Sequence, residues 1–195
     1  MNFFQVLNLV FVWYTFLLKS FLEFKPTKNN KIADVPVVKK EFIFSVEIKP
    51  VKKVRGWSSV TRITDGGNCC KPGNRIPMVK FRPNSYKLHI SFAVNGNGNR
   101  YFDTDPLKEG EYSTIVIKQI LKYGDEYRYS ISINGEEVFT DNNKKAQDYP
   151  DVKMYAGDNF FEPSDCFVRN LRFRNLGMWL EIFSFFFFFF FLIKI

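Results

Sequence analysis

Apolar and polar side chains alternate along most of this chain, a pattern typical of short antiparallel strands. In residues 86–94 every second position is apolar, and Lys87, His89 and Ser91 fall on the opposite face. Asn-Gly pairs at 95–96 and 134–135 tolerate positive φ and favour tight hairpins. No stretch has the period of an amphipathic helix. The pattern therefore predicts an all-β sandwich of two antiparallel sheets.

The strands expected from this pattern cover a continuous region that begins at Glu41. A pair is expected around the turn 82–85, and another around the turn 122–126. The expected strands are 42–50, 57–64, 75–81, 86–94, 101–102, 112–121, 127–133, 136–140, 152–156 and 167–173.

Both ends of the chain are apolar and differ from the alternating region between them. Residues 3–18 suit a signal peptide or an uncleaved membrane anchor, and the tail holds seven consecutive Phe at 185–191. Residues 178–193 are either low-complexity sequence or a tail anchor. The predicted division is a signal peptide or anchor (1–20), a Lys/Pro-rich stem (21–40), the sandwich (41–176) and an apolar tail (177–195).

The positive charge is uneven along the chain. The net charge is +8, and residues 19–55 hold ten Lys/Arg against four Asp/Glu. Residues 56–176 hold 17 against 15. A nucleic-acid-binding domain would carry a basic stripe on its folded unit. We therefore expect no nucleic-acid partner.

Three segments carry a resemblance to a known class of domains. They are WSSVTRITDGGNCCKPGNRIPMVKF, LHISFAVNGNGN and VRNLRF. Together they resemble an invertebrate extracellular domain of the concanavalin A-like lectin and laminin G-like superfamily, over roughly residues 41–175. The resemblance implies a jelly-roll sandwich that binds glycan or extracellular protein. Such domains carry Gly-Asp-Arg-Ile-Pro where this chain has Asn74 within Gly73–Pro77.

The sequence offers little for catalysis. A glucanase of this fold class needs two carboxylates on one strand. The nearest match is 103–105, which Pro106 predicts to be a loop. The single histidine, His89, lacks the Gly-x-Ser-x-Gly context of a hydrolase triad. His89 is therefore either a sugar contact or a merely exposed or hydrogen-bonded strand residue. We expect no enzyme, with a glycoside-active enzyme as the alternative.

Strand parity predicts where the loops gather. Alternate connections lie at opposite ends of an antiparallel sandwich, so loops 65–74, 95–99 and 141–151 should share one rim. Arg75 opens a strand there, either to recognise ligand or, as we favour, to bond loop carbonyls and a carboxylate. The candidate ligand-binding residues on this rim are Asp65, Asn68, Asn74, Arg75, Asn95, Asn97 and Asn99.

Cysteine and metal chemistry add few constraints. Parity places Cys166 far from Cys69 and Cys70, so neither should bond to it. Residues 65–68 could supply oxygen ligands to calcium, but their spacing does not favour it. No other cofactor is expected.

The sequence thus predicts a non-catalytic, lectin-like extracellular binding module, secreted or membrane-associated. It would recognise glycan or protein through its rim loops, and a membrane could be a further partner through the apolar ends. The other alternative is a membrane-tethered structural module without a small ligand.

Overall fold

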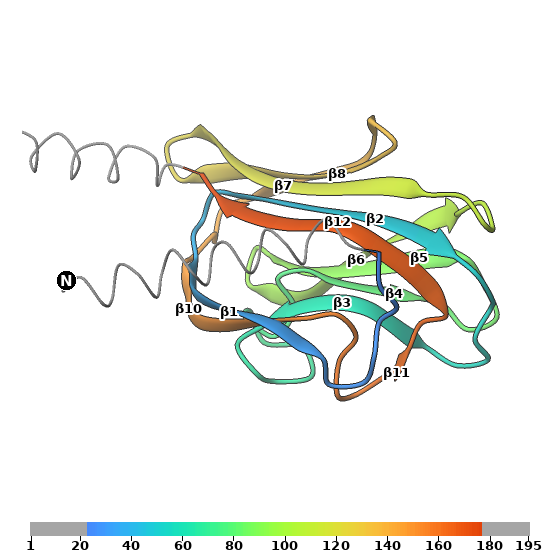
Figure 1. The fold of residues 1–195 in the computed structure, drawn as a ribbon. Coiled ribbons are helices and arrows are strands. Elements are labelled where there is room, and N and C mark those ends of the chain that lie inside the picture. Colours follow the sequence, from blue (N-terminus) through green and yellow to red (C-terminus); the bar gives the residue numbers. More distant parts are fainter. Residues whose placement is uncertain (1–22, 177–195) are drawn as a thin grey trace, which may run out of the picture.

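Two antiparallel sheets pack face to face in the computed structural model, which describes residues 23–176 (Figure 1). The long sheet has the order β1 (Lys31–Val38), β10 (Tyr149–Tyr155), β3 (Ser58–Thr64), β4 (Met78–Phe81), β5 (Lys87–Val94) and β6 (Asn97–Pro106), with β11 (Glu162–Pro163) parallel to β3. The short sheet has the order β12 (Cys166–Asn175), β2 (Phe42–Pro50), β7 (Ser113–Tyr123), β8 (Glu126–Ile133) and β9 (Glu136–Asn143). This is the predicted all-β jelly-roll sandwich.

The core lies between the sheets and follows from the alternation in the sequence. Each second side chain of β2 and β5 points inward, and Phe44, Leu88 and Ile90 are fully buried. Phe92 stacks on Tyr129 from the opposite sheet, with ring centroids 4.3 Å apart. Burial of each large apolar side chain contributes about 2 kcal/mol. This inner face therefore fixes the register of both sheets.

The long sheet is buried on its outer face as well. All seven residues of β3 and all four of β4 are buried, although half of them point away from the core. The loops 65–77 and 156–165 cover them. Gly157 donates to the carbonyl of Val60, and Ser164 donates to the carbonyl of Ser59. Polar side chains on this face are thus removed from water.

The predicted gathering of loops at one end is confirmed. Asn95 donates from its side chain to the carbonyl of Asn142, and Arg75 donates to the side chain of Asn99. Gly98 packs so tightly that a Cβ there would lie 2.2 Å from the carbonyl carbon of Lys71.

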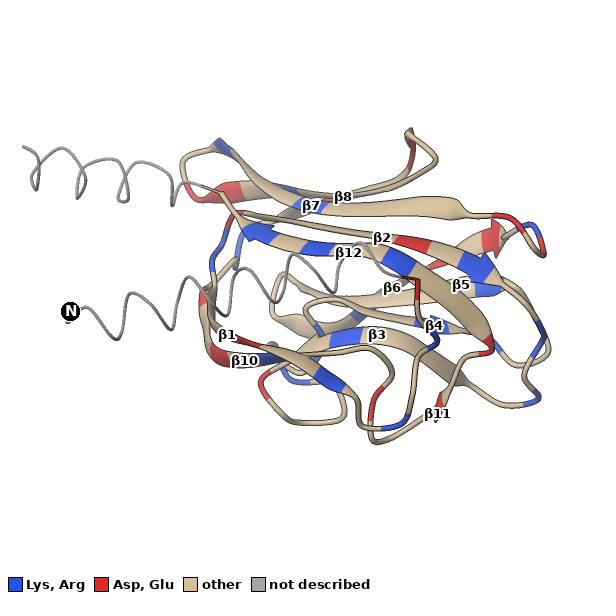
Figure 2. Ribbon diagram, in the orientation of Figure 1, with Lys and Arg blue, Asp and Glu red and all other residues tan. Residues whose placement is uncertain are grey.

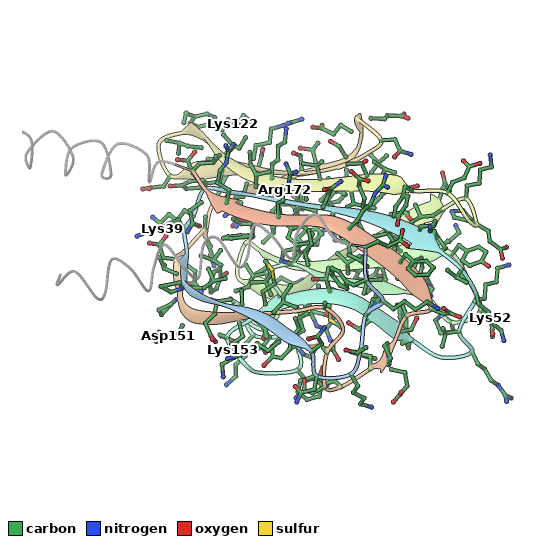
Figure 3. All side chains as sticks on the ribbon, viewed as in Figure 1. Lys39, Lys52, Lys122, Asp151, Lys153 and Arg172 are labelled. Carbon is green, nitrogen blue, oxygen red and sulfur yellow. A yellow bond between two sulfur atoms is a disulfide. The ribbon has the colours of Figure 1, made fainter. Side chains whose placement is uncertain are left out.

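Turn 82–85 lies at the other end, where Asn84 donates to the carbonyl of Val54. Figure 3 shows Lys39 and Lys122 at the first end and Lys52 at the second. Connections along the chain therefore alternate between the two ends, as parity requires.

Two expectations about extended segments are wrong. Residues 31–38 lie in the predicted stem, yet they form β1, which pairs with β10 from Lys31 to Val38. Asp103, Thr104 and Asp105 belong to β6 rather than to a loop, because Pro106 is the last residue of an edge strand, where its missing N–H costs nothing. The predicted leader (1–20) and the whole of the predicted tail (177–195, with its 178–193 stretch) fall outside the described residues.

The cysteines follow the prediction. Cys69 and Cys70 are bonded to each other, and Cys166 is free and buried. Neither rim cysteine therefore bonds Cys166. Within residues 23–176, no helix is long and apolar enough to cross a membrane.

We predict that β1 is required for stability. Removing residues 1–40 would strip β10 of its neighbour and remove Val38, which is fully buried in the core. Compared with residues 23–176, the truncated chain 41–176 should lose at least about 3 kcal/mol of unfolding free energy. Guanidinium unfolding followed by circular dichroism measures it.

The control is Asp34→Ala in residues 23–176, which alters an exposed side chain of β1. That variant should unfold with the unaltered midpoint. Equal midpoints for 41–176 and 23–176 would contradict the role of β1 in the fold.

Candidate functional site

A row of polar side chains crosses the outer face of the long sheet. Val79, Phe81, Leu88, Ile90 and Phe102 face the core, so the residues between them point the other way. Cross-strand pairing then places four polar residues in line, in the order Ser59, Lys80, His89 and Asp103. With Trp57, Arg62, Arg75, Tyr101 and Asp158 these residues form what we call the outer-face cluster.

Lys80 lies at the centre of the cluster. Its Nζ is 4.4 Å from the ring centroid of Trp57 and 4.4 Å from that of Phe161. The residue is only 5% exposed, and no carboxylate of the described chain lies within 4 Å of its Nζ. Burial, followed by repulsion from Arg75, lowers the pKa of Lys80 to about 8. The two rings offset part of this cost through cation–π attraction.

His89 is part of a hydrogen-bonded chain. Its Nδ1 lies 2.7 Å from Asp103 Oδ1, and the other oxygen of Asp103 accepts from Arg82 at 2.5 Å. Its ring stacks on Tyr101 with centroids 4.6 Å apart and meets Trp57 edge-on at 5.0 Å. Burial lowers the pKa of His89, while Asp103 opposes this. His89 is thus a hydrogen-bonded strand residue, as the structural alternative allowed, and it is buried rather than exposed.

Two arginines brace the loop that covers the cluster. Arg62 donates to the carbonyl of Asn74 at 2.9 Å, and to those of Gly67 and Asn68. Arg75 Nε donates to Asn68 O at 3.1 Å and its Nη1 donates to Asn99. The structural role favoured for Arg75 is confirmed for the loop carbonyl, although its second partner is an amide rather than a carboxylate.

Asp158 is the buried carboxylate among these cations. Its Oδ1 accepts from the backbone N–H groups of Phe160 and Phe161, at 2.7 and 2.8 Å. Its Oδ2 has no hydrogen-bond partner among the described residues, and neither do the hydroxyls of Ser59 and Ser91. Ser91 pairs with Met78 on the same outward side of the sheet. The face thus holds several polar groups with unused hydrogen-bonding capacity.

The rim residues predicted to bind ligand lie together but mostly bond to each other. Asn74 donates to Asp65 at 2.9 Å and is buried, and Asn99 donates from its backbone to Asn97. Asn95 is held by the 141–151 connection. The side chains left exposed on this rim are Asp65, Asn68, Asn95 and Asn97.

The calcium expectation does not fit the loop 65–68. The carbonyl of Asn68 accepts from Arg75 and Arg62, and one oxygen of Asp65 accepts from Asn74. Two guanidinium groups next to the loop would repel a dication. No group of three His, Cys, Asp or Glu in residues 23–176 could hold a metal ion.

A separate hollow of about 650 Å³ lies between the edge strands β6 and β9. Phe102, Leu107, Ile133 and Val138 line it, with Asp105, Lys108 and Glu136 also in its lining. None of the rim candidates reaches it. We regard the outer-face cluster as the better site, because the hollow lacks buried charge and unpartnered polar groups.

The sequence pattern did not reveal Lys80 or Trp57. Lys80 falls on the polar side of an alternating strand, where lysine is ordinarily solvated. Its burial depends on Phe161, which is far away in sequence. The one usable signal was the alternation itself, which puts Lys80, His89 and Asp103 on the same face of three consecutive strands.

Comparison with known proteins supports the fold and leaves the family undefined. No protein-family model and no curated protein matches the sequence. Among solved structures, a SAP-like pentraxin from Limulus polyphemus is 13% identical, with 77% of this chain and 74% of that chain covered and a TM-score of 0.52. The Trypanosoma rangeli sialidase in complex with sialic acid is 12% identical, covering 81% of this chain but 26% of its own, with a TM-score of 0.55. The carbohydrate-binding module CBM66 from Bacillus subtilis is 10% identical, covering 71% and 77%, with a TM-score of 0.42. The pentraxin and the sialidase, whose TM-scores exceed 0.5, support the two-sheet sandwich fold.

The prediction that this chain is not an enzyme is contradicted. Part of a chain named as a sialidase, 26% of its length, matches this fold, so the fold also occurs within a protein named as an enzyme. The sequence argument also relied on residues 103–105 forming a loop, whereas Asp103 lies on a strand and contacts the only histidine. These likenesses show the fold alone and decide neither activity nor its absence.

We predict that Lys80→Met stabilises the protein. The lowered pKa of Lys80 means that its buried charge costs free energy, and a thioether of similar length would not. At neutral pH the unfolding free energy should rise by about 1–3 kcal/mol. The matched control is Lys153→Met on β10, where the side chain is exposed and the change should lie within about 0.5 kcal/mol. Denaturant unfolding that shows Lys80→Met destabilising would contradict a costly charge.

The stability that Lys80→Met gains over the wild type should disappear at high pH. Because the folded-state pKa of Lys80 is about 8, below its usual 10.5, the unfolded chain binds more protons between these values. The wild-type chain therefore gains stability relative to Lys80→Met as the pH rises from about 8 to 10.5. Unfolding curves of both proteins across this range should converge. A difference that stays constant would show that Lys80 titrates normally.

Proposed function

We propose that this chain is a lectin-like extracellular binding module that recognises a glycan on the outer face of its long sheet. One observation carries the proposal: a line of hydrogen-bonding groups flanked by aromatic rings crosses this face. The groups are Lys80, His89 and Asp103, and the rings are Trp57 and Tyr101. Sugars are bound by the same combination, in which ring faces contact C–H groups and polar side chains bond hydroxyls.

Exposure of the rings supports access by a ligand. Tyr101 is 51% exposed, and Trp57 is half-buried with Arg82 against its ring at 5.3 Å. The exposed rim residues Asp65, Asn68 and Asn97 would extend the site at one end of the sandwich. They retain the role predicted for the rim, as secondary contacts.

A protein ligand is the second candidate. The exposed apolar side chains Ile120, Leu121 and Tyr123 cluster near the β7–β8 turn, with exposures of 39, 45 and 62%. Exposed apolar side chains gathered at one turn favour a protein contact, and we call this group a patch. This patch lies on the short sheet and shares no residue with the outer-face cluster.

An extracellular location is part of the proposal. The bonded pair Cys69–Cys70 supports an oxidising compartment, since such bonds are rare in reducing ones.

Tyr101→Ala should weaken glycan binding. Tyr101 is exposed, so its removal costs little stability, while an aromatic contact is worth about 0.5–1.5 kcal/mol, or roughly twofold to twelvefold in affinity. A glycan array identifies the ligand, and titration calorimetry compares the variants. Tyr123→Ala is the matched control, as an exposed tyrosine on the other sheet. No glycan binding by the wild type, or a loss with Tyr123→Ala alone, would contradict the proposed site.

A further inference from the structure

We propose that the ligand of the outer-face cluster is an acidic glycan, whose carboxylate or sulfate group pairs with Lys80. The inference rests on the proposed function and names the ligand class for the same site. Its grounds are the charge balance of the cluster, its unused hydrogen-bonding groups and the rings that border it.

The first ground is an excess of buried positive charge. Arg62, Arg75 and Lys80 are 1, 5 and 5% exposed, and Asp158 is the carboxylate that faces all three of them. Asp103 is already shared between His89 and Arg82. Buried charges are ordinarily matched by opposite ones, because removing an ion from water is costly. The cluster thus favours an added anion.

The second ground is that the two arginines and Lys80 are used differently. Arg62 and Arg75 donate hydrogen bonds to loop carbonyls, and Arg75 also donates to the side chain of Asn99. The ammonium of Lys80 can donate three hydrogen bonds. In the described structure it contacts two rings and no acceptor. An oxyanion would supply the acceptors that Lys80 lacks.

Other lysines of the described chain show the contrast. Lys25, Lys39 and Lys49 are exposed enough to be hydrated and still pair with Asp165, Asp148 and Glu23, respectively. Lys80 is buried and has no such partner. The distinction supports a functional rather than a structural use of its charge.

The third ground concerns which anion fits. The hydroxyl groups of Ser59 and Ser91 are buried on the same face and have no partners, so they mark unused hydrogen-bonding capacity there. Tyr101 and Trp57 border the row, and Tyr101, which is half exposed, would contact a sugar ring. An acidic peptide would satisfy Lys80 but has less use for these rings. An acidic glycan uses both features.

Binding should depend on pH in a defined direction. The charged groups that face Lys80 are Arg62, Arg75, Asp103 and Asp158, with His89 as its cross-strand neighbour. An anion pairs only with the protonated ammonium, and its presence would raise the pKa of Lys80. Affinity should therefore fall as the pH rises above about 8.

The experiment is titration calorimetry on the full chain with four probes: heparin, polygalacturonate, neutral dextran and poly-glutamate. We expect heparin or polygalacturonate to bind, dextran to bind at least tenfold more weakly, and affinity to fall with added salt. Lys80→Met should lower the affinity for the acidic glycan at least tenfold. The control, Lys153→Met, removes an exposed charge from β10 of the same sheet and should change affinity less than threefold.

The outcomes separate this inference from the proposed function. Neutral glycans that bind through Tyr101, with no preference for acidic ones, would overturn the acidic ligand and leave the glycan module intact. Equal affinity of wild type and Lys80→Met for heparin and polygalacturonate would overturn the role of Lys80. If poly-glutamate binds as tightly as polygalacturonate, the ligand is an acidic peptide rather than a glycan. A retained thermal transition shows that Lys80→Met is folded.

Discussion

The burial of charged side chains on the outer face of the long sheet is the constraint on which the site depends. A strand that is polar on one side would ordinarily present that side to water. Here the loops 65–77 and 156–165 close over it, and the guanidinium of Arg62 anchors the first loop through three carbonyls. Asp158 shapes the second loop by accepting two backbone N–H groups. Charges and loops thus hold each other in place.

Stability and binding make opposite demands on this arrangement. The hydrogen bonds that Arg62 and Arg75 donate to the loops offset the free-energy cost of burying them. Lys80 has only ring contacts. A site that binds an anion must keep a cation ready before the ligand arrives, and preorganisation of that kind lowers stability. Basic and acidic residues elsewhere on the sandwich are interspersed (Figure 2). The cluster differs from them in being buried.

Much of the fold followed from the sequence, because alternation and turn chemistry are local signals. The strands at 42–50 and 86–94, the hairpin at Asn134-Gly135 and the shared end of the loops all rest on such signals. β1 was missed because Lys31–Val38 is an edge strand with Pro36 inside it and a mixed pattern. Asp103 was assigned to a loop for a related reason, as Pro106 ends an edge strand. Pairing partners decide both cases, and they are distant in sequence.

The site was less predictable than the fold. The alternation of connections predicted that the rim residues lie together. It could not show that Asn74 and Arg75 form hydrogen bonds within the protein. Nor could it show that Phe161 would close over Lys80 from a loop some eighty residues away, since the cover of a sheet face is a tertiary property.

The central claim is that Lys80 carries a buried charge with no anionic partner. NMR titration of the Lys80 Cε and Nζ resonances in the free protein tests it most directly. The structure predicts a pKa of about 8, well below the usual 10.5. A value at or above 10.5 would show that the ammonium is hydrated or already paired, and would contradict the account.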